Sequence, residues 1–246
     1  MYYNMGIDGT GIATVADSFA ALEQRVVNEG LLTWDEMYKA LKDDYAGTRG
    51  EYIRRMLSTA NRYGSGGAAD EWARRVSQAF SDDVVAMDDA RVKFIPGWFS
   101  WSNTIQLGKA VGATPNGRKA NEPINHGANP HPGFRKDGAL TAMSNAICQI
   151  QPGYGNTAPI QLELDPNMAR DDEGIDKVVS YIRTIFRNGA TLLNINIINA
   201  EDILKGHENP ALYPDLVVRV TGFTTYFCLL TPEFRQLVVD RILTAS

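Results

Sequence analysis

The 246-residue chain is poor in cysteine and histidine, with two of the former and three of the latter. Cys148 and Cys228 lie far apart in the sequence, so a disulfide framework is not expected and a reducing cytoplasm is the predicted compartment. The sequence contains no Cys-x-x-Cys pair and no cysteine–histidine cluster, so we expect no zinc or iron–sulfur site made by this chain alone.

The chain also lacks an excess of positive charge and a long apolar run. Its 24 basic and 29 acidic residues give a net charge of −5, which leaves no basic footprint for nucleic acid. No stretch approaches the roughly 20 apolar residues of a membrane span. Residues 1–10 have neither the basic nor the apolar region of a secretory signal. We therefore expect no nucleic-acid partner, no membrane association and a cytoplasmic location.

Helical patterns dominate the first part of the chain. Asp17 and Ser18 are placed to cap a helix that stops at Gly30, and Thr33–Glu36 has the pattern of a capping box. Further helices are predicted at about 51–59 and 68–85 from the spacing of their apolar residues.

Between Phe94 and Gly155 the chain is rich in glycine, proline, asparagine and serine, which predicts loops. Aromatic residues are interleaved with them, so the region is expected to be ordered and packed rather than a flexible linker. Trp98 and Trp101 are predicted to lie in the core.

The C-terminal third alternates strands and helices. Residues 160–164 show strict apolar–polar alternation, a helical pattern follows at 174–187, and 192–198 is a second predicted strand. A third strand at 216–220 ends near Gly222, and Thr231 caps a final helix with proline at its first position. Strand–helix–strand order indicates an α/β architecture.

Gly222 interrupts a stretch of β-branched and aromatic residues. The plain interpretation of such a glycine is a bulge, a tight turn or a close approach of two backbone segments. Its neighbours suggest a second interpretation, because Arg219–Phe223 reads RVTGF. This resembles the glycyl radical signature, in which Ser or Ala and then Tyr are the commoner residues at the positions of Thr221 and Phe223.

Three further segments resemble the same family in the same order. They are Gly11–Ser18 (GIATVADS), Gly112–Lys119 (GATPNGRK) and Lys136–Ala142 (KDGALTA). Four spaced segments are more specific than one pentapeptide, and together they span nearly the whole chain. The sequence resembles the C-terminal part of the pyruvate formate-lyase-like glycyl radical enzymes.

The resemblance implies a fold and a division into domains. The implied fold is the C-terminal half of a ten-stranded α/β barrel with a glycyl radical loop near the C-terminus. Residues 1–105 would form a mostly helical portion of the barrel domain, and residues 106–246 would form the glycine radical domain. Half of a barrel exposes unpaired strands, so we expect this chain to aggregate, to form homo-oligomers or to need a partner chain.

The resemblance also implies a catalytic residue. Gly222 would store an unpaired electron on its α-carbon, and a glycine suits this role because a Cβ would crowd the planar radical. Arg219, Val220, Thr221 and Phe223 would support the radical loop. A dry surround is expected from the apolar residues near it, namely Val218, Val220, Phe223, Tyr226 and Phe227, because exclusion of water suppresses side reactions.

The implied partners follow from what the family chemistry needs. A radical S-adenosylmethionine activase with an iron–sulfur cluster would install the glycyl radical as a post-translational modification, and the chain itself would hold no permanently bound cofactor. In the family a cysteine on another loop becomes the thiyl radical, and neither Cys148 nor Cys228 matches that loop. The chain is therefore expected to be inactive alone and to require a chain that carries the thiyl cysteine.

Several interpretations stay open at the level of sequence. The chain could be a fragment, a subunit, or a spare part that replaces an oxygen-damaged glycyl domain in another enzyme. It could also be a non-catalytic structural subunit in which Gly222 is a plain turn residue. The reaction is equally open among formate acetyltransferase, lyase, dehydratase and decarboxylase chemistry.

Two histidines are candidates for an acid–base or metal site. His126 and His131, with Asp137, lie in a proline-rich loop without the spacing of helical ligands, so a structural role is the expected one. Gly153–Gly155 and Asn116–Gly117 hint at phosphate loops, but neither lies between a strand and a helix as such loops require.

Overall fold

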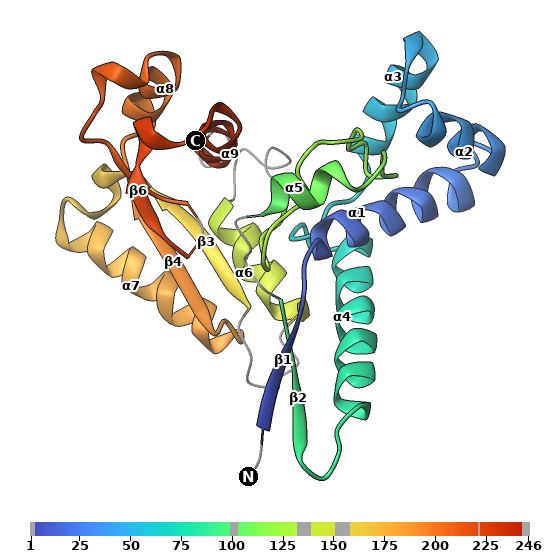
Figure 1. Cartoon of the computed structure of the whole chain (residues 1–246), viewed down its shortest axis with the longest axis horizontal. Coiled ribbons are helices and arrows are strands. Elements are labelled where there is room, and N and C mark those ends of the chain that lie inside the picture. The colour runs from blue at the N-terminus through green and yellow to red at the C-terminus, as the bar shows by residue number, and fades with distance from the viewer. Residues whose placement is uncertain (1–2, 99–102, 132–138, 151–157, 221, 243–246) are drawn as a thin grey trace.

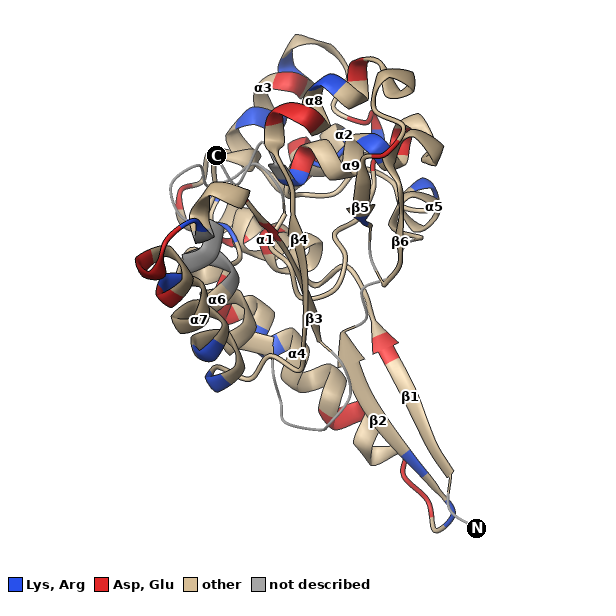
Figure 2. Ribbon diagram, turned by 90° about the vertical axis from the view of Figure 1, so that its left-hand side faces the viewer, with Lys and Arg blue, Asp and Glu red and all other residues tan. Residues whose placement is uncertain are grey.

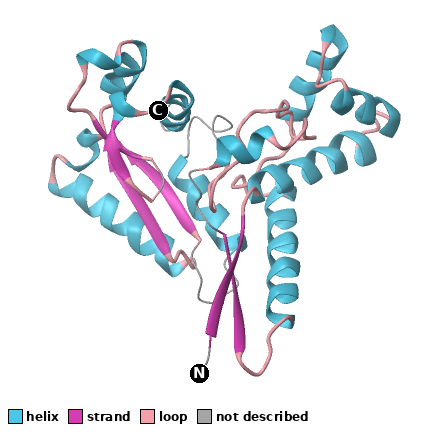
Figure 3. Ribbon diagram, viewed as in Figure 1, coloured by secondary structure: helices cyan, strands magenta, loops and turns pink. Residues whose placement is uncertain are grey.

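The computed structural model describes residues 3–98, 103–131, 139–150, 158–220 and 222–242. The helices and strands follow the order β1 (Tyr3–Gly9), α1 (Ile12–Leu22), α2 (Trp34–Lys42), α3 (Gly47–Ser58), α4 (Ala68–Ala86), β2 (Val92–Trp98), α5 (Thr104–Lys109), α6 (Ala139–Ile150), β3 (Pro159–Leu164), α7 (Asp172–Arg187), β4 (Leu192–Ile197), α8 (Ala200–Glu208), β5 (Val217–Arg219), β6 (Thr224–Tyr226) and α9 (Pro232–Ile242). Figure 3 shows this mixture of helices and strands, which confirms the α/β class.

The strands form three separate pairs within the described part of the chain. β1 pairs with β2 and β3 pairs with β4, both in parallel, whereas β5 and β6 form an antiparallel hairpin. The β1–β2 pair projects from the body of the molecule with the N-terminus at its far end (Figures 1 and 2). α7 runs along β3 and β4 (Figure 1).

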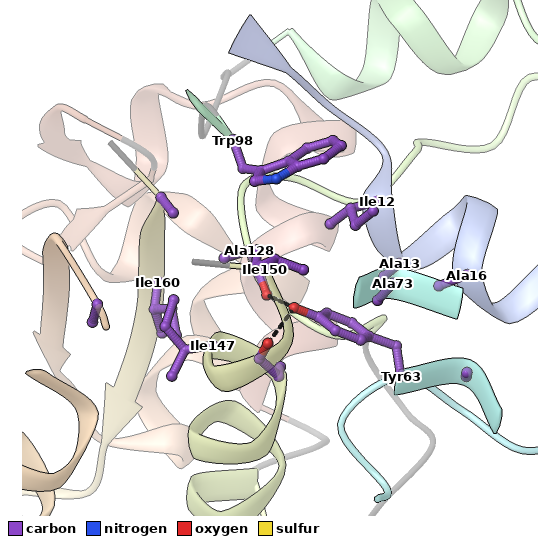
Figure 4. Packing of buried hydrophobic residues seen from close by; sticks show 14 of the residues in the cluster. Ile12, Ala13, Ala16, Tyr63, Ala73, Trp98, Ala128, Ile147, Ile150 and Ile160 are labelled. Atoms are coloured by element: carbon purple, nitrogen blue, oxygen red, sulfur yellow. Dashed lines mark hydrogen bonds between the residues drawn. The ribbon is translucent and has the colours of Figure 1, made fainter. Parts of the chain in front are cut away.

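One core joins the N-terminal helices to the β3–β4 pair. Small residues of α1 and α4 let these two helices approach closely, and α6, β3 and α7 complete the same cluster. Tyr63 is fully buried at its centre, and its hydroxyl donates to the carbonyl oxygens of Ala146 at 2.8 Å and Ala128 at 3.2 Å (Figure 4). Trp98 is also buried, as predicted, whereas Trp101 lies outside the described residues.

The start of the first helix was predicted wrongly. α1 begins at Ile12, after Gly11 in a left-handed conformation with φ of +88°, and continues past Leu22 into a π-helical segment that ends at Asn28. Asp17 is therefore inside the helix and is not its cap. The local pattern predicts that its carboxylate caps the helix, but the carboxylate pairs with the distant Arg62 instead.

The region predicted as loop contains regular structure. Val92–Trp98 is a strand and Ala139–Ile150 is a helix, and β1 was also missed at the N-terminus. Glycine and proline inside β2 hid its pattern, because such residues normally end a strand, and Pro96 is tolerated here in a pair of strands with open edges.

Other predicted elements are confirmed. The capping box of α2 forms, with Thr33 accepting from the Glu36 amide at 3.2 Å and Glu36 accepting from the Thr33 amide at 3.0 Å. The strands predicted at 160–164 and 192–198 correspond to β3 and β4, and the helix predicted at 174–187 corresponds to α7.

Candidate functional site

Gly222 lies at the tip of the β5–β6 hairpin. Arg219 pairs with Thr224, and the amide of Val220 donates to the carbonyl of Phe223 at 3.0 Å, so the chain reverses within two residues. Gly222 has a φ of +42°, a region that favours glycine. It is exposed, and a Cβ added to it would meet no heavy atom within 4 Å. Its α-carbon is therefore open to a partner molecule.

The apolar residues around Gly222 divide into two groups. Val218, Val220 and Phe227 are buried in a small core with α8 and α9, on the side that supports the hairpin. Phe223 and Tyr226 are 44% and 48% exposed. The predicted dry surround of Gly222 is thus not formed by the described residues of this chain, and Thr221 lies outside them.

Arg219 is tied to the neighbouring strand β4. Its guanidinium donates to Asn194 Oδ1 at 3.3 Å and to Thr224 Oγ1 at 3.2 Å. Its backbone amide donates to Asn196 Oδ1 at 2.6 Å, and its carbonyl accepts from Asn196 Nδ2 at 2.8 Å. The arm of the hairpin before Gly222 is therefore fixed on β4 by side chain and backbone together.

One face of the β3–β4 pair is polar and largely buried. The parallel register places Gln161 beside Asn194 and Glu163 beside Asn196, so these four side chains share a face. A groove of about 420 Å³ runs between β4 and the hairpin, and its polar lining consists of Asn194, Asn196, Arg219 and Thr224. The site lies toward the carboxyl ends of two parallel strands, where α/β proteins place their functional residues.

A buried ion pair closes the far side of this face. Glu163 of β3 accepts from Arg241 Nη1 of α9 at 3.2 Å, with the two side chains 6% and 7% exposed. Burial raises the pKa of Glu163, and the charge of Arg241 opposes that rise. Arg241 also reaches the carbonyl of Arg219 at 3.5 Å, so the C-terminal helix contacts the arm of the hairpin.

Two of the family-like segments lie together, away from the hairpin. Arg62 donates to the Asp17 carboxylate at 3.0 Å and to the carbonyl of Asn116 at 3.1 Å, and it thereby links Gly11–Ser18 to Gly112–Lys119. Burial raises the pKa of Asp17 to about 6, against the effect of the Arg62 charge. Much of Lys136–Ala142 lies outside the described residues.

Gly112–Lys119 is a packed loop. Arg118 is 5% exposed and donates to four backbone carbonyls, including those of Glu122 at 2.6 Å and Lys119 at 2.9 Å. The hydroxyl of Tyr45 donates to the carbonyl of Thr114 at 2.7 Å. The guanidinium is occupied by the loop itself, which agrees with the argument against a phosphate loop at Asn116–Gly117.

The two histidines are structural in this arrangement. Nε2 of His131 lies 2.8 Å from the hydroxyl of Thr14. Burial lowers the pKa of both His126 and His131 to about 3, and nearby arginine charges add to that effect. Both rings are therefore neutral at pH 7. Asp137, the third member of the hypothetical acid–base group, lies outside the described residues.

The remaining candidates for chemistry are spread apart. Cys148 is exposed on α6 and Cys228 is half-buried after β6. Among the described residues, no three His, Cys, Asp or Glu side chains gather as metal ligands do, and no helix is long and apolar enough to cross a membrane.

Asn194, Asn196 and Glu163 were not predicted from the sequence as residues of the site. They occupy positions in β3 and β4 where alternation predicts solvent exposure, yet Asn194 and Asn196 are only 8% and 7% exposed. The available signal was the occurrence of amide and carboxylate side chains at every second position of two successive strands.

Comparisons with known proteins match this arrangement. Residues 1–108 match the family described as pyruvate formate lyase-like, and residues 124–228 match the glycine radical family. The isethionate sulfite-lyase of Oleidesulfovibrio alaskensis is 29% identical over 94% of this chain and 28% of its own length.

Solved structures agree with the sequence comparison. The structure describing 1,2-propanediol dehydration in Roseburia inulinivorans superposes with a TM-score of 0.90 and 26% identity, covering 98% of this chain and 31% of that one. The B12-independent glycerol dehydratase of Clostridium butyricum gives a TM-score of 0.85 and 27% identity, covering 98% and 30%. The chain thus spans less than a third of these relatives, and it belongs to the pyruvate formate-lyase-like glycyl radical enzymes.

Proposed function

We propose that Gly222 is the residue that carries the glycyl radical. The observation that supports it is the position of RVTGF, inside the glycine radical match, with Gly222 exposed at a hairpin tip and free of neighbours. The α-hydrogen would leave as a hydrogen atom to the adenosyl radical of a separate activase. Arg219, Val220, Thr221 and Phe223 would support the loop.

The test is electron paramagnetic resonance after anaerobic incubation with an activase. The chain should give a doublet that Gly222→Ala abolishes. Gly30→Ala is the matched control, because Gly30 also has a positive φ of +62° and open space around a Cβ. Air should then cleave the activated chain at the bond between residues 221 and 222. A signal that survives in Gly222→Ala would exclude this residue as the radical site.

The structure also favours the alternative of a non-catalytic subunit in one respect. Gly222 is the second residue of a two-residue turn with positive φ, which a purely structural glycine would also occupy. The two functions separate in the experiment above, since a structural turn gives no doublet and no cleavage by oxygen.

We infer that residues outside this sequence, on a second chain or elsewhere in a longer one, complete the enzyme and carry the thiyl cysteine. In support, neither parallel pair, β1–β2 or β3–β4, has a third strand among the described residues. Parallel sheets usually contain more strands and are covered on both faces. Tyr3 and Met5 of β1 are 57% and 51% exposed. In this proposal residues 1–105 belong to a ten-stranded barrel and residues 106–246 form the radical domain.

This inference has a direct test in sedimentation at micromolar concentration. The isolated chain should associate with itself into dimers or larger oligomers, and a co-expressed chain with the cysteine loop should give a defined complex. A monodisperse monomer that melts cooperatively would contradict the need for a partner. A spare-part role is supported instead if the chain restores activity to a full-length enzyme cleaved by oxygen.

For the completed enzyme we propose cleavage of a carbon–oxygen or carbon–sulfur bond in a small polar substrate. The support is that the relatives described above are an isethionate sulfite-lyase, a glycerol dehydratase and a protein of 1,2-propanediol dehydration. The partner's cysteine would return a hydrogen atom to Gly222 and become the thiyl radical. Assays of the completed enzyme with isethionate, glycerol and 1,2-propanediol test this proposal. If none of the three is cleaved and the enzyme instead exchanges formate into an acyl donor, the proposal is wrong.

A further inference from the structure

Two asparagine side chains in this protein take the place of a neighbouring strand. The Asn129 amide donates to the carbonyl of Gln161 at 2.9 Å and accepts from its N–H at 2.8 Å. The Asn196 amide makes the same pair of bonds with Arg219, at 2.8 Å and 2.6 Å. A primary amide has the donor and acceptor of a peptide group, so each side chain satisfies one residue of a strand in both directions.

The pairing pattern of the hairpin explains why Arg219 needs such a partner. The amide of Val220 bonds to Phe223, and that of Phe227 bonds to Leu216. Hydrogen-bonded pairs alternate along an antiparallel ladder, so Arg219 and Thr224 form a non-hydrogen-bonded pair. The N–H and C=O of Arg219 consequently face away from β6, where Asn196 meets them in a buried position.

The contacts that hold the hairpin tip converge on Arg219. Asn196 binds its backbone, Asn194 binds its guanidinium, and Arg241 approaches its carbonyl. Beyond it, Val220 is anchored in the core with α8 and α9, while Gly222 has no neighbour around its Cα substituent position. The position of the tip is therefore set a few residues earlier in the chain, at the arm that Asn196 grips.

We propose that Asn196 is a positioning residue for the radical-bearing tip. Its amide fixes the backbone of Arg219 on β4 and so sets the direction in which the α-hydrogen of Gly222 is presented. This proposal rests on the function proposed for Gly222. Transfer of a hydrogen atom depends on the distance and alignment of the reacting atoms, so a shift of about 1 Å in the tip slows the reaction by roughly a hundredfold.

The first test needs no radical and measures amide hydrogen exchange in the full chain. Asn196→Leu keeps the approximate shape and removes both bonds to Arg219, so exchange at Val220 and Thr225 should accelerate by about ten- to a hundredfold. Exchange at Leu162 of β3 should stay unchanged. Acceleration confined to the Arg219 amide, or equal acceleration throughout the chain, overturns the proposal.

Two matched variants make this test specific. Asn194→Leu removes one bond to the Arg219 side chain and none to its backbone, so hairpin exchange should change by less than about threefold. Asn129→Leu removes the same two-way pairing from β3, and it should accelerate exchange at Gln161 while leaving the hairpin unchanged. An Asn129 effect on the hairpin equal to that of Asn196 would show general destabilisation and overturn the positioning role.

The second test follows the radical itself. In Asn196→Leu, radical formation by the activase should slow by about tenfold or more, because the tip is no longer held in one orientation. The doublet should broaden, because the backbone at Gly222 then adopts a range of conformations with different hyperfine couplings. Asn196→Asp loses the donor to the Arg219 carbonyl and places a carboxylate beside that oxygen and beside buried Glu163, so radical formation should be at least as slow as in Asn196→Leu.

The possible results separate the two proposals. If the wild-type chain gives no doublet, the function proposed for Gly222 is wrong, and so is the role of Asn196 in radical formation. The exchange data still decide whether Asn196 holds the hairpin. If the wild type forms the radical and Asn196→Leu equals it in rate and line shape, the positioning role fails and the function of Gly222 stands.

Discussion

Two of the family-like segments differ in how their glycines are packed: Gly112–Lys119 is enclosed, whereas the hairpin tip at Gly222 is exposed. The first is enclosed by its own Arg118, and a Cβ at Gly117 would lie 3.0 Å from the carbonyl of Arg54. The second leaves Gly222 without a neighbour within 4 Å of such an atom. Both glycines have positive φ, so local conformation does not distinguish them. Their packing does, because Gly117 is enclosed by its neighbours and Gly222 is open, as the radical role proposed for it requires.

The largest expected effect on stability comes from a substitution in the enclosed segment Gly112–Lys119. Arg118→Leu leaves four backbone carbonyls without their donor, and bonds from a charged group contribute about 1.5–3 kcal/mol each without being additive. We expect the free energy of unfolding to fall by about 3–5 kcal/mol, measured by urea denaturation. Arg74→Ala removes an exposed ion pair with Glu71 and should cost less than about 1 kcal/mol.

A paired substitution of the two glycines tests the comparison directly. Gly117→Ala adds a close contact to the strain of a positive φ of +90° and should cost about 2–4 kcal/mol. Gly222→Ala adds strain alone and should cost about 1 kcal/mol, yet it should abolish the doublet. The same unfolding and resonance measurements serve both variants. Equal stability losses, or loss of the doublet in Gly117→Ala with the fold retained, would remove the distinction.

The sequence predicted these two segments unequally well. The pentapeptide around Gly222 and the strand β5 that precedes it are local patterns, so they could be found without the structure. The carbonyls that Arg118 binds lie within seven positions of it, but no residue pattern in the sequence marks them as its partners. The ion pair that places Asp17 in a helix interior depends on Arg62, 45 positions later in the chain. Local spacing carries no information on such pairs.

The polar face of β3 and β4 shows the same limit. Both strands were predicted correctly from the sequence, β3 by its alternation. The burial of Asn194 and Asn196 was not predicted, because neither strand carries information about the hairpin more than 20 residues later that covers them. The grip of Asn196 on Arg219 follows from tertiary structure alone.

The pH dependence of stability tests a second enclosed group, the ring of His131. Folding lowers the pKa of His131 from 6.5 to about 3, so between these values the unfolded chain binds a proton that the folded chain does not. Stability from this group is complete above pH 6.5 and is lost as the pH falls, by at most about 1.4 kcal/mol per pH unit.

His131→Gln isolates this effect, since glutamine can still bond to Thr14 but cannot charge. The wild type should lose about 2 kcal/mol more than the variant between pH 7 and pH 5, from urea midpoints at the two values. The raised pKa of Asp17 acts in the opposite direction, but it is common to both proteins and cancels in the difference. An identical pH dependence in the two would show that His131 titrates in the folded state as it does in water.

The smallest expected effect lies at the tip. Phe223 is 44% exposed, so Phe223→Tyr adds a hydroxyl that points into open surroundings and should change the free energy of unfolding by less than about 0.5 kcal/mol. The yield of the doublet should be unchanged in the isolated chain, because no described neighbour covers Gly222. In complex with a partner that does cover it, the hydroxyl could gain a hydrogen bond, and slower loss of the radical in air would then report that the tip is enclosed only in the complex. A stability gain above about 1 kcal/mol in the isolated chain would instead mean that the tip is already packed, and the contrast with Gly117 would fail.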